Sequence, residues 1–468
     1  MESKKKGSFS SSIGFVLAAA GSAVGVGNVW RFPYLAARDG GGLFILIYLV
    51  LVLTFGFTLL TTDIALGRRT GKNAWHAFGS IRARWAWLGK LTFLVPVLIM
   101  TYYSVIGGWI LKYATVYVTG QHAAVAEDSF FTSFITSPVS PIVFMLIFLA
   151  MTAFIVYNGV EKGIEKFSKF IMPALLLLII GVAGYALTLH HTAPDGTVRT
   201  GLQGLRLYLV PNFEGLTFSR FLSILLDAMS QLFFSLSVSM GIMITYGSYV
   251  KKDVDLSRSI HQVEFFDTGV ALLAGAMVIP SIYVFMGTEG MTSGPSLMFV
   301  SLPKVFATMG PAGILLGAAF FLMILFAALT SCVSILETLV STCMDLFHCS
   351  RRKVSLTIGL LAAAASVIIC MGYNVFYFEL TLPNGNTAQL LDLADYISNS
   401  FLMPLISMLT CIFVGWVIRP TWIDAEMELG GKKFPAKKLY SFMIRWPAPI
   451  IMAILFLQST GLMTRLFS

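Results

Sequence analysis

Long apolar segments dominate this sequence and limit what it can fold into. Because 57% of its 468 residues are hydrophobic and only 12% are charged, a water-soluble fold would have to bury almost every helix on all sides. Lipid solvates such helices directly, and about 20 apolar residues are enough to cross a bilayer. We therefore expect an all-α membrane protein with eleven spans. The expected spans are 13–37, 42–67, 88–118, 141–157, 168–189, 221–250, 260–286, 312–347, 354–373, 391–418 and 439–463.

The basic residues predict an orientation for these spans. Most of the 32 lysines and arginines lie in the amino-terminal tail and in alternate connections. Those connections are 68–90, 162–169, 251–258, 351–353 and 419–445. The positive-inside rule then places the amino terminus in the cytoplasm and, after eleven crossings, the carboxyl terminus outside. The net charge of +9 is explained by this topology, so we expect a lipid bilayer and no nucleic acid as partner.

Two further observations narrow the class of protein. The five cysteines lie in or beside apolar segments and lack the spacing of a metal site or of a secreted disulfide framework. Glycines interrupt the first apolar run, and no cleavage site follows it. We therefore expect no cleaved signal peptide and a first helix that stays in the protein.

The first span carries a run of small residues, Gly21 to Asn28, halfway along its length. Each glycine costs a helix interior up to about 1 kcal/mol, so the run predicts a helix that unwinds near the middle of the membrane. Small residues also allow two helices to pack closely, which is the simpler interpretation. Asn28 and Arg31 favour the break, because both need polar surroundings that a packing face does not supply.

The sixth span has a similar interruption. Ser235, Ser237 and Ser239 alternate before Gly241, and irregular backbone inside a membrane is tolerated only where it lines a cavity or is buried in protein. Two interrupted helices five spans apart are typical of inverted-repeat transporters, where the freed backbone groups bind an anionic group and a cation. The pattern therefore predicts a solute-binding site near the middle of the membrane.

Polar side chains in the seventh and eighth spans could complete this site. Asp267 is an acid inside an apolar run, which is costly unless the carboxylate is paired. It could instead reach water at the cytoplasmic end of its helix. Thr330 and Ser331 could offer oxygen ligands to a hard cation, or they could bond back to their own helix, as membrane hydroxyls commonly do.

At these residues the sequence resembles the neurotransmitter:sodium symporter family, in its bacterial amino-acid branch. The resemblance rests on residues 23–34, AVGVGNVWRFPY, and 231–237, QLFFSLS, and it extends over essentially the whole chain. It implies a leucine-transporter-like fold with 11 transmembrane helices. Two inverted five-helix repeats, 13–189 and 221–418, would be followed by one extra helix at 439–463, and residues 1–468 would form a single transporter domain.

The resemblance implies two sodium sites. The first would use the Ala23 carbonyl with Asn28, Ser235 and Asp267. The second would use the carbonyls of Gly21, Val24 and Ala327 with the hydroxyls of Thr330 and Ser331. Chloride-dependent relatives bind the anion near the positions that match Tyr48, Gln231, Ser235, Asp267 and Ala271. Asp267 stands where many members have Asn, and its fixed carboxylate could replace the anion, so we expect transport without chloride.

The resemblance also implies an amino-acid substrate. The Tyr103 hydroxyl and the amides around Gly25 would hold its carboxylate, and carbonyls near Ser22, Phe234 and Ser237 would take its ammonium group. Monoamine transporters of the family have Asp at the position that matches Gly25, so Gly leaves room for an amino acid with its own carboxylate. The remaining walls would be Ile99, Phe234, Met240, Ser331 and Ile335. They predict a sizeable hydrophobic or aromatic side chain.

Two gates are expected on either side of this substrate site. Outside, Arg31 and Asp395 would close above the substrate near Gln231, with Phe234 and Tyr103 beneath them. Inside, Lys6 would face Asp345, with Phe9, Ser248 and Tyr249 nearby. Gly163 and Pro173 resemble a family motif that lets the fifth span unwind and hydrate the second sodium site.

We therefore expect a sodium-coupled symporter that imports an amino acid across a bacterial plasma membrane by alternating access. An intramembrane enzyme would start from buried acids, but none of them forms a recognisable catalytic pair. Those acids are Asp63, Asp227, Asp267, Glu337 and Asp345. A channel would not need charged gates on both sides of one site. A proton-coupled transporter with Asp267 as the proton carrier, or an amino-acid sensor that does not transport, would retain the same pocket.

Overall fold

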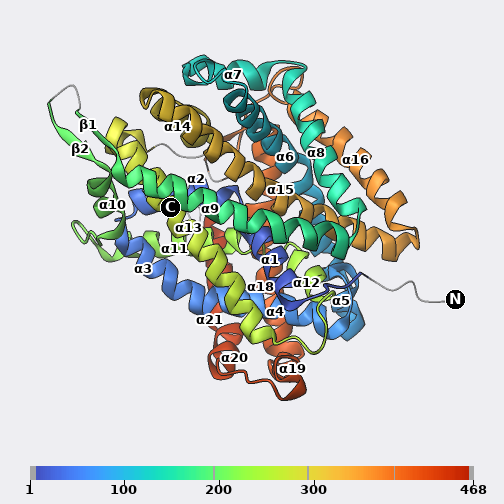
Figure 1. The fold of residues 1–468 in the computed structure, drawn as a ribbon. Coiled ribbons are helices and arrows are strands. Elements are labelled where there is room, and N and C mark those ends of the chain that lie inside the picture. The colour runs from blue at the N-terminus through green and yellow to red at the C-terminus, as the bar shows by residue number, and fades with distance from the viewer. Residues whose placement is uncertain (1–6, 193–195, 292–294, 384, 463–468) are drawn as a thin grey trace.

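The computed structural model describes residues 7–192, 196–291, 295–383 and 385–462, and it is a bundle of helices with two short hairpins (Figure 1). In these residues nine helical segments are long and apolar enough to cross a membrane, and a tenth is a bent pair. The nine are Gly42–Thr70, Ala83–Val118, Ser140–Tyr157, Val160–Thr188, Leu256–Met286, Pro311–Phe347, Arg351–Met371, Leu390–Val417 and Lys437–Ser459. The bent pair joins Ser12–Ala23 to Val26–Arg38.

These segments contain the following elements. The first part of the chain forms α1 (Ser12–Ala23), α2 (Val26–Arg38), α3 (Gly42–Leu51), η1 (Val52–Gly56), α4 (Phe57–Thr70), α5 (Ala74–Ile81), η2 (Ala83–Trp85), α6 (Ala86–Val118), η3 (Ala124–Ala126), α7 (Asp128–Thr136), α8 (Ser140–Tyr157), η4 (Val160–Glu165) and α9 (Lys166–Thr188). The middle forms β1 (His190–Thr192), β2 (Val198–Thr200), α10 (Gly201–Leu209), α11 (Phe218–Ser235), α12 (Ile242–Gly247), α13 (Leu256–Met286), η5 (Thr288–Gly290), η6 (Leu297–Ser301), α14 (Leu302–Thr308) and α15 (Pro311–Phe347). The last part forms α16 (Arg351–Met371), β3 (Leu380–Thr381), β4 (Thr387–Ala388), α17 (Leu390–Asp395), η7 (Tyr396–Leu402), α18 (Met403–Ile412), η8 (Phe413–Val417), α19 (Thr421–Met427), η9 (Leu429–Gly431), α20 (Lys437–Arg445) and α21 (Pro447–Ser459).

The expected sixth span, 221–250, consists of two separate helices. Helix α11 (18 residues) ends at Ser235 and α12 (6 residues) begins at Ile242, and within the described residues neither is among the helices both long and apolar enough to cross a membrane alone. The expected start of the fifth span was wrong. It begins at Val160 rather than near 168, because the π-helical turn η4 continues the helix through Glu161 and Lys162, whose side chains are exposed.

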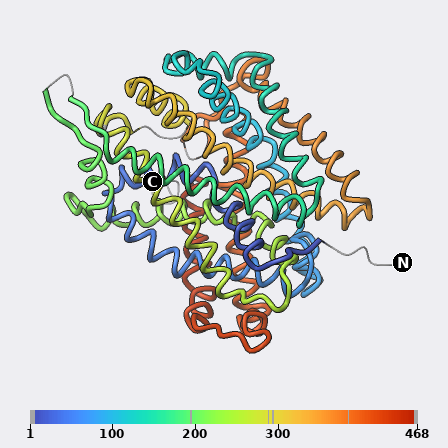
Figure 2. Tube along the Cα trace, viewed as in Figure 1, coloured from blue at the N-terminus to red at the C-terminus, as the bar shows by residue number. Residues whose placement is uncertain are grey.

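The helices pack in groups around the interrupted spans. Helix α6 packs against α8, α15 and α16, while α13 packs against α1, α2 and α9. Figure 2 shows that the chain crosses the bundle repeatedly, so segments far apart in sequence meet in its centre. One continuous cluster of buried apolar side chains joins these groups. This packing places residues of the first, sixth, seventh and eighth spans side by side.

Close approach of α4 and α12 needs a glycine. A Cβ on Gly67 would lie 1.9 Å from the carbonyl oxygen of Ile244, whereas a Cβ on Gly181 in α9 would meet nothing within 4 Å. Small residues are the usual means by which membrane helices bring their backbones together. The contact joins the second span to the second helix of the broken sixth span.

We predict that Gly67→Ala lowers the melting temperature of the purified protein in detergent. The added methyl group must push α12 away from α4, and such overpacking costs about 1–3 kcal/mol. Gly181→Ala is the matched control and should be neutral or slightly stabilising, because alanine favours helix by up to about 1 kcal/mol over glycine. Equal melting temperatures for Gly67→Ala and the wild type would contradict the prediction.

Candidate functional site

The break in the first span leaves only Val24 and Gly25 between α1 and α2. The two helices are bent by 55° at this point. The amide of Gly25 donates a hydrogen bond to Oδ1 of Asn28 at 3.0 Å, which caps the start of α2. The small residues thus produce the predicted break rather than only a packing face.

The break in the sixth span is strained and is held by the first and second spans. Ser237 and Ser239 have φ values of 52° and 61°, a left-handed conformation that costs a residue other than glycine about 1–2 kcal/mol. The Ser237 hydroxyl donates to the Ser22 carbonyl at 2.9 Å, and the Ser239 amide donates to Asp63 Oδ2 at 2.9 Å. Sequence reasoning missed this role of Asp63, although an acid in an apolar run was a signal that it needed a partner.

A cavity lies between the two breaks. All ten residues predicted from the sequence to contact a substrate line it, and they come from the first, third, sixth and eighth spans. They are Ser22, Gly25, Ile99, Tyr103, Phe234, Ser235, Ser237, Met240, Ser331 and Ile335. The cavity is also lined by Ala23 and Asn28, and by four residues that the sequence analysis did not predict, Val26, Gly27, Tyr102 and Ile242.

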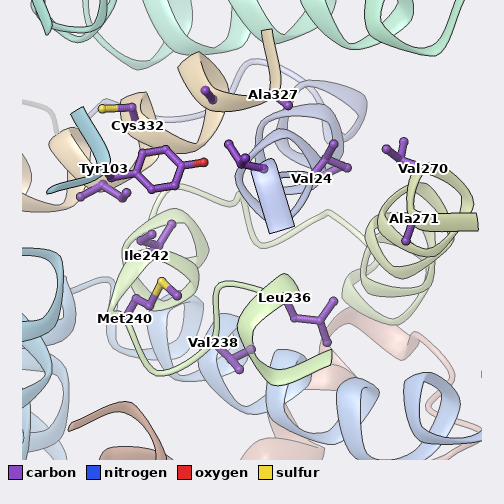
Figure 3. Packing of buried hydrophobic residues seen from close by; sticks show 14 of the residues in the cluster. Val24, Tyr103, Leu236, Val238, Met240, Ile242, Val270, Ala271, Ala327 and Cys332 are labelled. Carbon is purple, nitrogen blue, oxygen red and sulfur yellow. The ribbon is translucent and has the colours of Figure 1, made fainter. Parts of the chain in front are cut away.

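The cavity combines an apolar wall with a buried hydroxyl. Figure 3 shows the Tyr103 hydroxyl pointing from α6 toward the break of the first span, while Met240 and Ile242 lie on the sixth span. Within the described residues this hydroxyl is buried and has no hydrogen-bond partner. A buried polar group without a partner is unfavourable, so the hydroxyl is available to a bound molecule.

On one side of the cavity, Asp267 is completely buried in a cluster of hydrogen-bond donors. Its Oδ1 accepts from the Ser235 hydroxyl at 2.8 Å and from Asn28 Nδ2 at 2.9 Å. The alternative that Asp267 reaches water is therefore wrong, because its side chain has no exposed surface. The cluster gathers the carboxylate of Asp267 and the hydroxyl of Ser235, whose oxygens are hard ligands suited to a small hard cation.

Beside the break of α1 lies a second cluster, of hydroxyls and main-chain carbonyls. The Ser331 hydroxyl lies 3.5, 3.2 and 3.3 Å from the carbonyl oxygens of Gly21, Ser22 and Val24. The Thr330 hydroxyl donates to the Ala327 carbonyl at 3.0 Å. Thr330 thus bonds back to its own helix, while Ser331 reaches the first span and lies among carbonyls that the end of α1 leaves free.

The predicted outer gate residues are held by different neighbours. Arg31 donates to the Ser230 hydroxyl at 2.7 Å, and Asp395 accepts from Asn399 Nδ2 at 2.6 Å. Arg31 and Asp395, both within the described residues, form no direct ion pair here. Gln231 Nε2 donates to the Gly27 carbonyl at 3.4 Å, which places Gln231 against the break of the first span.

Part of the predicted inner gate lies outside the described residues, because Lys6 precedes them. Asp345 accepts from Asn73 Nδ2 at 2.6 Å. Phe9 packs edge-on against Tyr249, with ring centroids 6.1 Å apart, and its amide donates to the Tyr249 carbonyl at 3.2 Å. Next to Tyr249, the Ser248 hydroxyl donates to the Thr245 carbonyl.

The fifth span holds the start of the first through a residue that sequence reasoning missed. Glu165, at the end of η4, accepts hydrogen bonds from the Ser10 amide at 2.7 Å and from the Ser11 hydroxyl at 3.0 Å. Gly163 lies in the same π-helical turn, and Pro173 lies inside α9. A π-helical turn is a weak point of helical hydrogen bonding, and here it lies beside the amino-terminal segment.

Comparison with known proteins agrees with this geometry. The model of the sodium:neurotransmitter symporter family matches residues 6–131 and 132–466. An uncharacterized sodium-dependent transporter of Bacillus subtilis, YhdH, is 35% identical over 99% of this chain and 100% of its own length. An uncharacterized sodium-dependent transporter of Methanocaldococcus jannaschii is 32% identical over 99% of this chain and 92% of its own length.

A solved structure has a similar fold and a related sequence. The crystal structure of MhsT in complex with L-phenylalanine has a TM-score of 0.83 and 34% sequence identity, over 97% of this chain and 100% of that one. The chain therefore belongs to the sodium:neurotransmitter symporter family. It is a multi-pass, sodium-dependent membrane transporter, and the enzyme alternative is excluded.

We predict that Tyr103→Phe leaves the melting temperature of the purified protein unchanged or slightly raised. The hydroxyl that it removes has no partner within the described residues, so no internal hydrogen bond is lost. Tyr113→Phe is the matched control on the same helix, since that hydroxyl donates to the Phe299 carbonyl at 2.8 Å. Its loss should destabilise by about 1 kcal/mol. A larger loss of stability in Tyr103→Phe than in Tyr113→Phe would be the opposite of what we expect.

Proposed function

We propose that this protein is a sodium-coupled symporter that imports a hydrophobic or aromatic amino acid by alternating access. The observation that carries the proposal is the cavity between the two broken helices, with one oxygen cluster at Asp267 and another at Ser331. A solute and its coupling ions would bind in the same region, so that each could stabilise the binding of the other.

The two clusters would be the sodium sites. Asp267, Asn28 and Ser235 would hold the first ion together with the Ala23 carbonyl. Ser331 would hold the second with the carbonyls of Gly21 and Val24, while Thr330 and Ala327 would turn from their mutual hydrogen bond toward the ion. Family membership implies the use of sodium, and the carboxylate, hydroxyl and carbonyl oxygens gathered in the two clusters support these assignments.

The substrate carboxylate would bind at the Tyr103 hydroxyl and at Gly25. A Cβ at Gly25 would lie 3.4 Å from the Tyr103 hydroxyl oxygen and 3.3 Å from Ser331 Oγ, so any larger residue would fill this position. Carbonyls near Ser22, Phe234 and Ser237 would accept from the ammonium group. The crystal structure of MhsT is a complex with L-phenylalanine, which supports a hydrophobic or aromatic side chain.

The side-chain pocket is apolar. Its walls are Ile99, Phe234, Met240, Ile242 and Ile335. Methionine adapts its shape and makes favourable contacts with aromatic rings, so Met240 suits side chains of several sizes.

We further propose that residues 1–468 form a single domain with eleven spans, in which α11 and α12 together make the sixth. The repeats would be 13–189 and 221–418, followed by the extra helix at 439–463. The amino terminus would be cytoplasmic and the carboxyl terminus outside, in a bacterial plasma membrane. The two unwound segments, in the first and sixth spans, support this arrangement because inverted repeats place such breaks together.

Alternating access would use the predicted gates. Arg31 would leave Ser230 and close toward Asp395 with Gln231 nearby. Inside, Asp345 would pair with Lys6. Unwinding of η4 at Gly163, before Pro173, would admit water to the second sodium site.

The main proposal predicts concentrative uptake by the full-length protein in liposomes. With a sodium gradient, radioactive L-phenylalanine should accumulate, and apolar amino acids should compete with it. Choline or lithium in place of sodium, at a fixed pH gradient, should abolish uptake. Uptake that persists without sodium would favour proton coupling, and binding without accumulation would identify a sensor.

Tyr103→Phe should weaken phenylalanine binding about tenfold or more, because a hydrogen bond to a charged group is lost, while Tyr113→Phe should not.

Chloride should not be required for this uptake. Asp267 already carries a fixed negative charge beside the proposed first sodium site, so replacement of chloride by gluconate should leave the uptake rate within about twofold. Asp267→Asn keeps the shape and removes the charge, and its uptake should fall or become chloride-dependent. Asp424→Asn, a buried acid on α19 outside the cavity, is the control. Collapse of wild-type uptake in gluconate would defeat this part of the proposal.

A further inference from the structure

A second buried acid lies on α13, one helical turn before Asp267. The Glu264 side chain is only 3% exposed, and its Oε1 is buried without a hydrogen-bond partner within the described residues. Its Oε2 lies 3.2 Å from Nδ1 of His261, whose side chain is 50% exposed. This acid belongs to none of the clusters assigned above to sodium, substrate or gates.

His261 gives this buried carboxyl a connection to the basic end of the helices. It lies five residues after the start of α13, about 8 Å along the helix, just beyond the connection that carries Lys251 and Lys252. Its ring stacks on Phe57 with centroids 4.6 Å apart, and Phe57 packs on Phe434 from the connection before α20. In the proposed orientation this end of the bundle faces the cytoplasm.

The charges that act on Glu264 are few. In the part of the chain that the structure describes they are His261 and Asp267, both on α13. Within the described residues, helices α1, α2, α4, α9, α10 and α14, the short turns η1 and η5, and strands β1 and β2 also pack against α13. None of these elements brings a further charge to Glu264. Thr268 lies one turn above Glu264 on the same face of the helix, and its buried hydroxyl also lacks a partner among the residues described.

An ionised carboxylate at this position would be costly. Half of its hydrogen-bonding capacity would be unmet in apolar surroundings, and a buried charge is tolerated only when it is well paired. One proton bound to the pair removes this cost. It can reside on Glu264, which then donates to Nδ1 of a neutral His261, or on His261, whose Nδ1–H then donates to the carboxylate. With the proton bound the pair is neutral overall, and without it the pair carries one negative charge.

We propose that His261 and Glu264 form a proton-binding site, loaded from the cytoplasm, that opposes sodium binding at the Asp267 cluster. The inference rests on the proposed sodium site. Glu264 and Asp267 are three residues apart, a rise of about 4.5 Å along the helix. A negative charge on Glu264 therefore stabilises a cation at the Asp267 cluster, and a bound proton removes that stabilisation. By linkage, sodium binding must expel the proton and a bound proton must weaken sodium binding.

This arrangement predicts how protons from the cytoplasm would affect sodium binding. A proton arriving through His261 would lower the affinity for sodium on the side where sodium must leave. The two ions never need to share ligands, because the coupling runs through charge along one helix. The site would thus favour inward release of sodium when the cytoplasm is acidic.

The test measures binding of radioactive Na⁺ to the purified full-length protein at pH 6 and pH 8, with and without L-phenylalanine. The wild type should bind Na⁺ about fivefold or more weakly at pH 6 than at pH 8. Glu264→Gln is uncharged at both pH values, so most of this difference should disappear and its affinity should resemble that of the wild type at pH 6. Identical pH dependence in the wild type and Glu264→Gln would overturn the inference.

Two controls separate this site from general effects of acid. Asp424→Asn removes another buried carboxyl, one of whose oxygens has no hydrogen-bond partner in the described part of the chain, and it should keep the wild-type pH dependence. His261→Gln should alter the pH dependence of sodium binding. His122→Gln, which replaces a half-buried histidine outside α13, is its control and should leave that dependence unchanged. If Asp424→Asn loses the pH dependence as fully as Glu264→Gln, the inference fails.

A measurement on the wild type alone keeps the inference testable if Glu264→Gln does not fold. Addition of Na⁺ to the purified protein in weak buffer near pH 6.5 should release protons, detected with a pH-sensitive dye, and choline should release none. Sodium binding without proton release would overturn the inference and leave the proposed function intact. If the wild type shows no sodium binding at all, the proposed function fails and this inference fails with it.

Discussion

Two helices are interrupted inside apolar surroundings, and the architecture of the centre depends on how their freed backbone groups are satisfied. In a membrane such groups cannot turn to water. Here the two breaks satisfy each other, because the Ser237 hydroxyl donates to the Ser22 carbonyl. Asp63 holds the Ser239 amide from the second span, and Ser331 faces the remaining carbonyls from the eighth. Polar groups that would each be costly alone become tolerable together, and a cavity remains between them.

The need to compensate buried polar groups also explains where the ionisable side chains lie. Asp267 is buried with Asn28 and Ser235 on one side of the cavity, and Glu264 lies a turn away with His261 as its partner. Each acid needs a compensating charge or proton in this environment. Binding a cation is one way to supply it. A transporter that runs on ion gradients can use this need, because the binding and release of each ion changes the stability of a neighbouring charge.

Much of the cavity was predictable from sequence because glycines and serines inside apolar runs are costly and therefore informative. The small residues from Gly21 to Asn28 and the serines from Ser235 to Ser239 marked both breaks, and the resemblance to the symporter family supplied Ile99, Tyr103 and Ile335, which carry no local signal. The roles of Asp63 and Glu165 were missed, because their partners are backbone amides and hydroxyls in distant spans. The start of the fifth span was misplaced, because charged residues continue that helix in a π-helical turn.

By itself, the sequence determined that the chain crosses a membrane many times, that two helices break, and which family it belongs to. Those properties depend on local composition, on helix propensity and on motifs that are contiguous in the chain. Tertiary structure decided which polar groups meet. Ser331 faces the first span while Thr330 bonds to its own helix, and Asp267 is sealed from water. Among the described residues, Glu264 keeps one oxygen without a partner. These outcomes depend on helix rotation and packing, where a turn of one residue moves a side chain by about 100°.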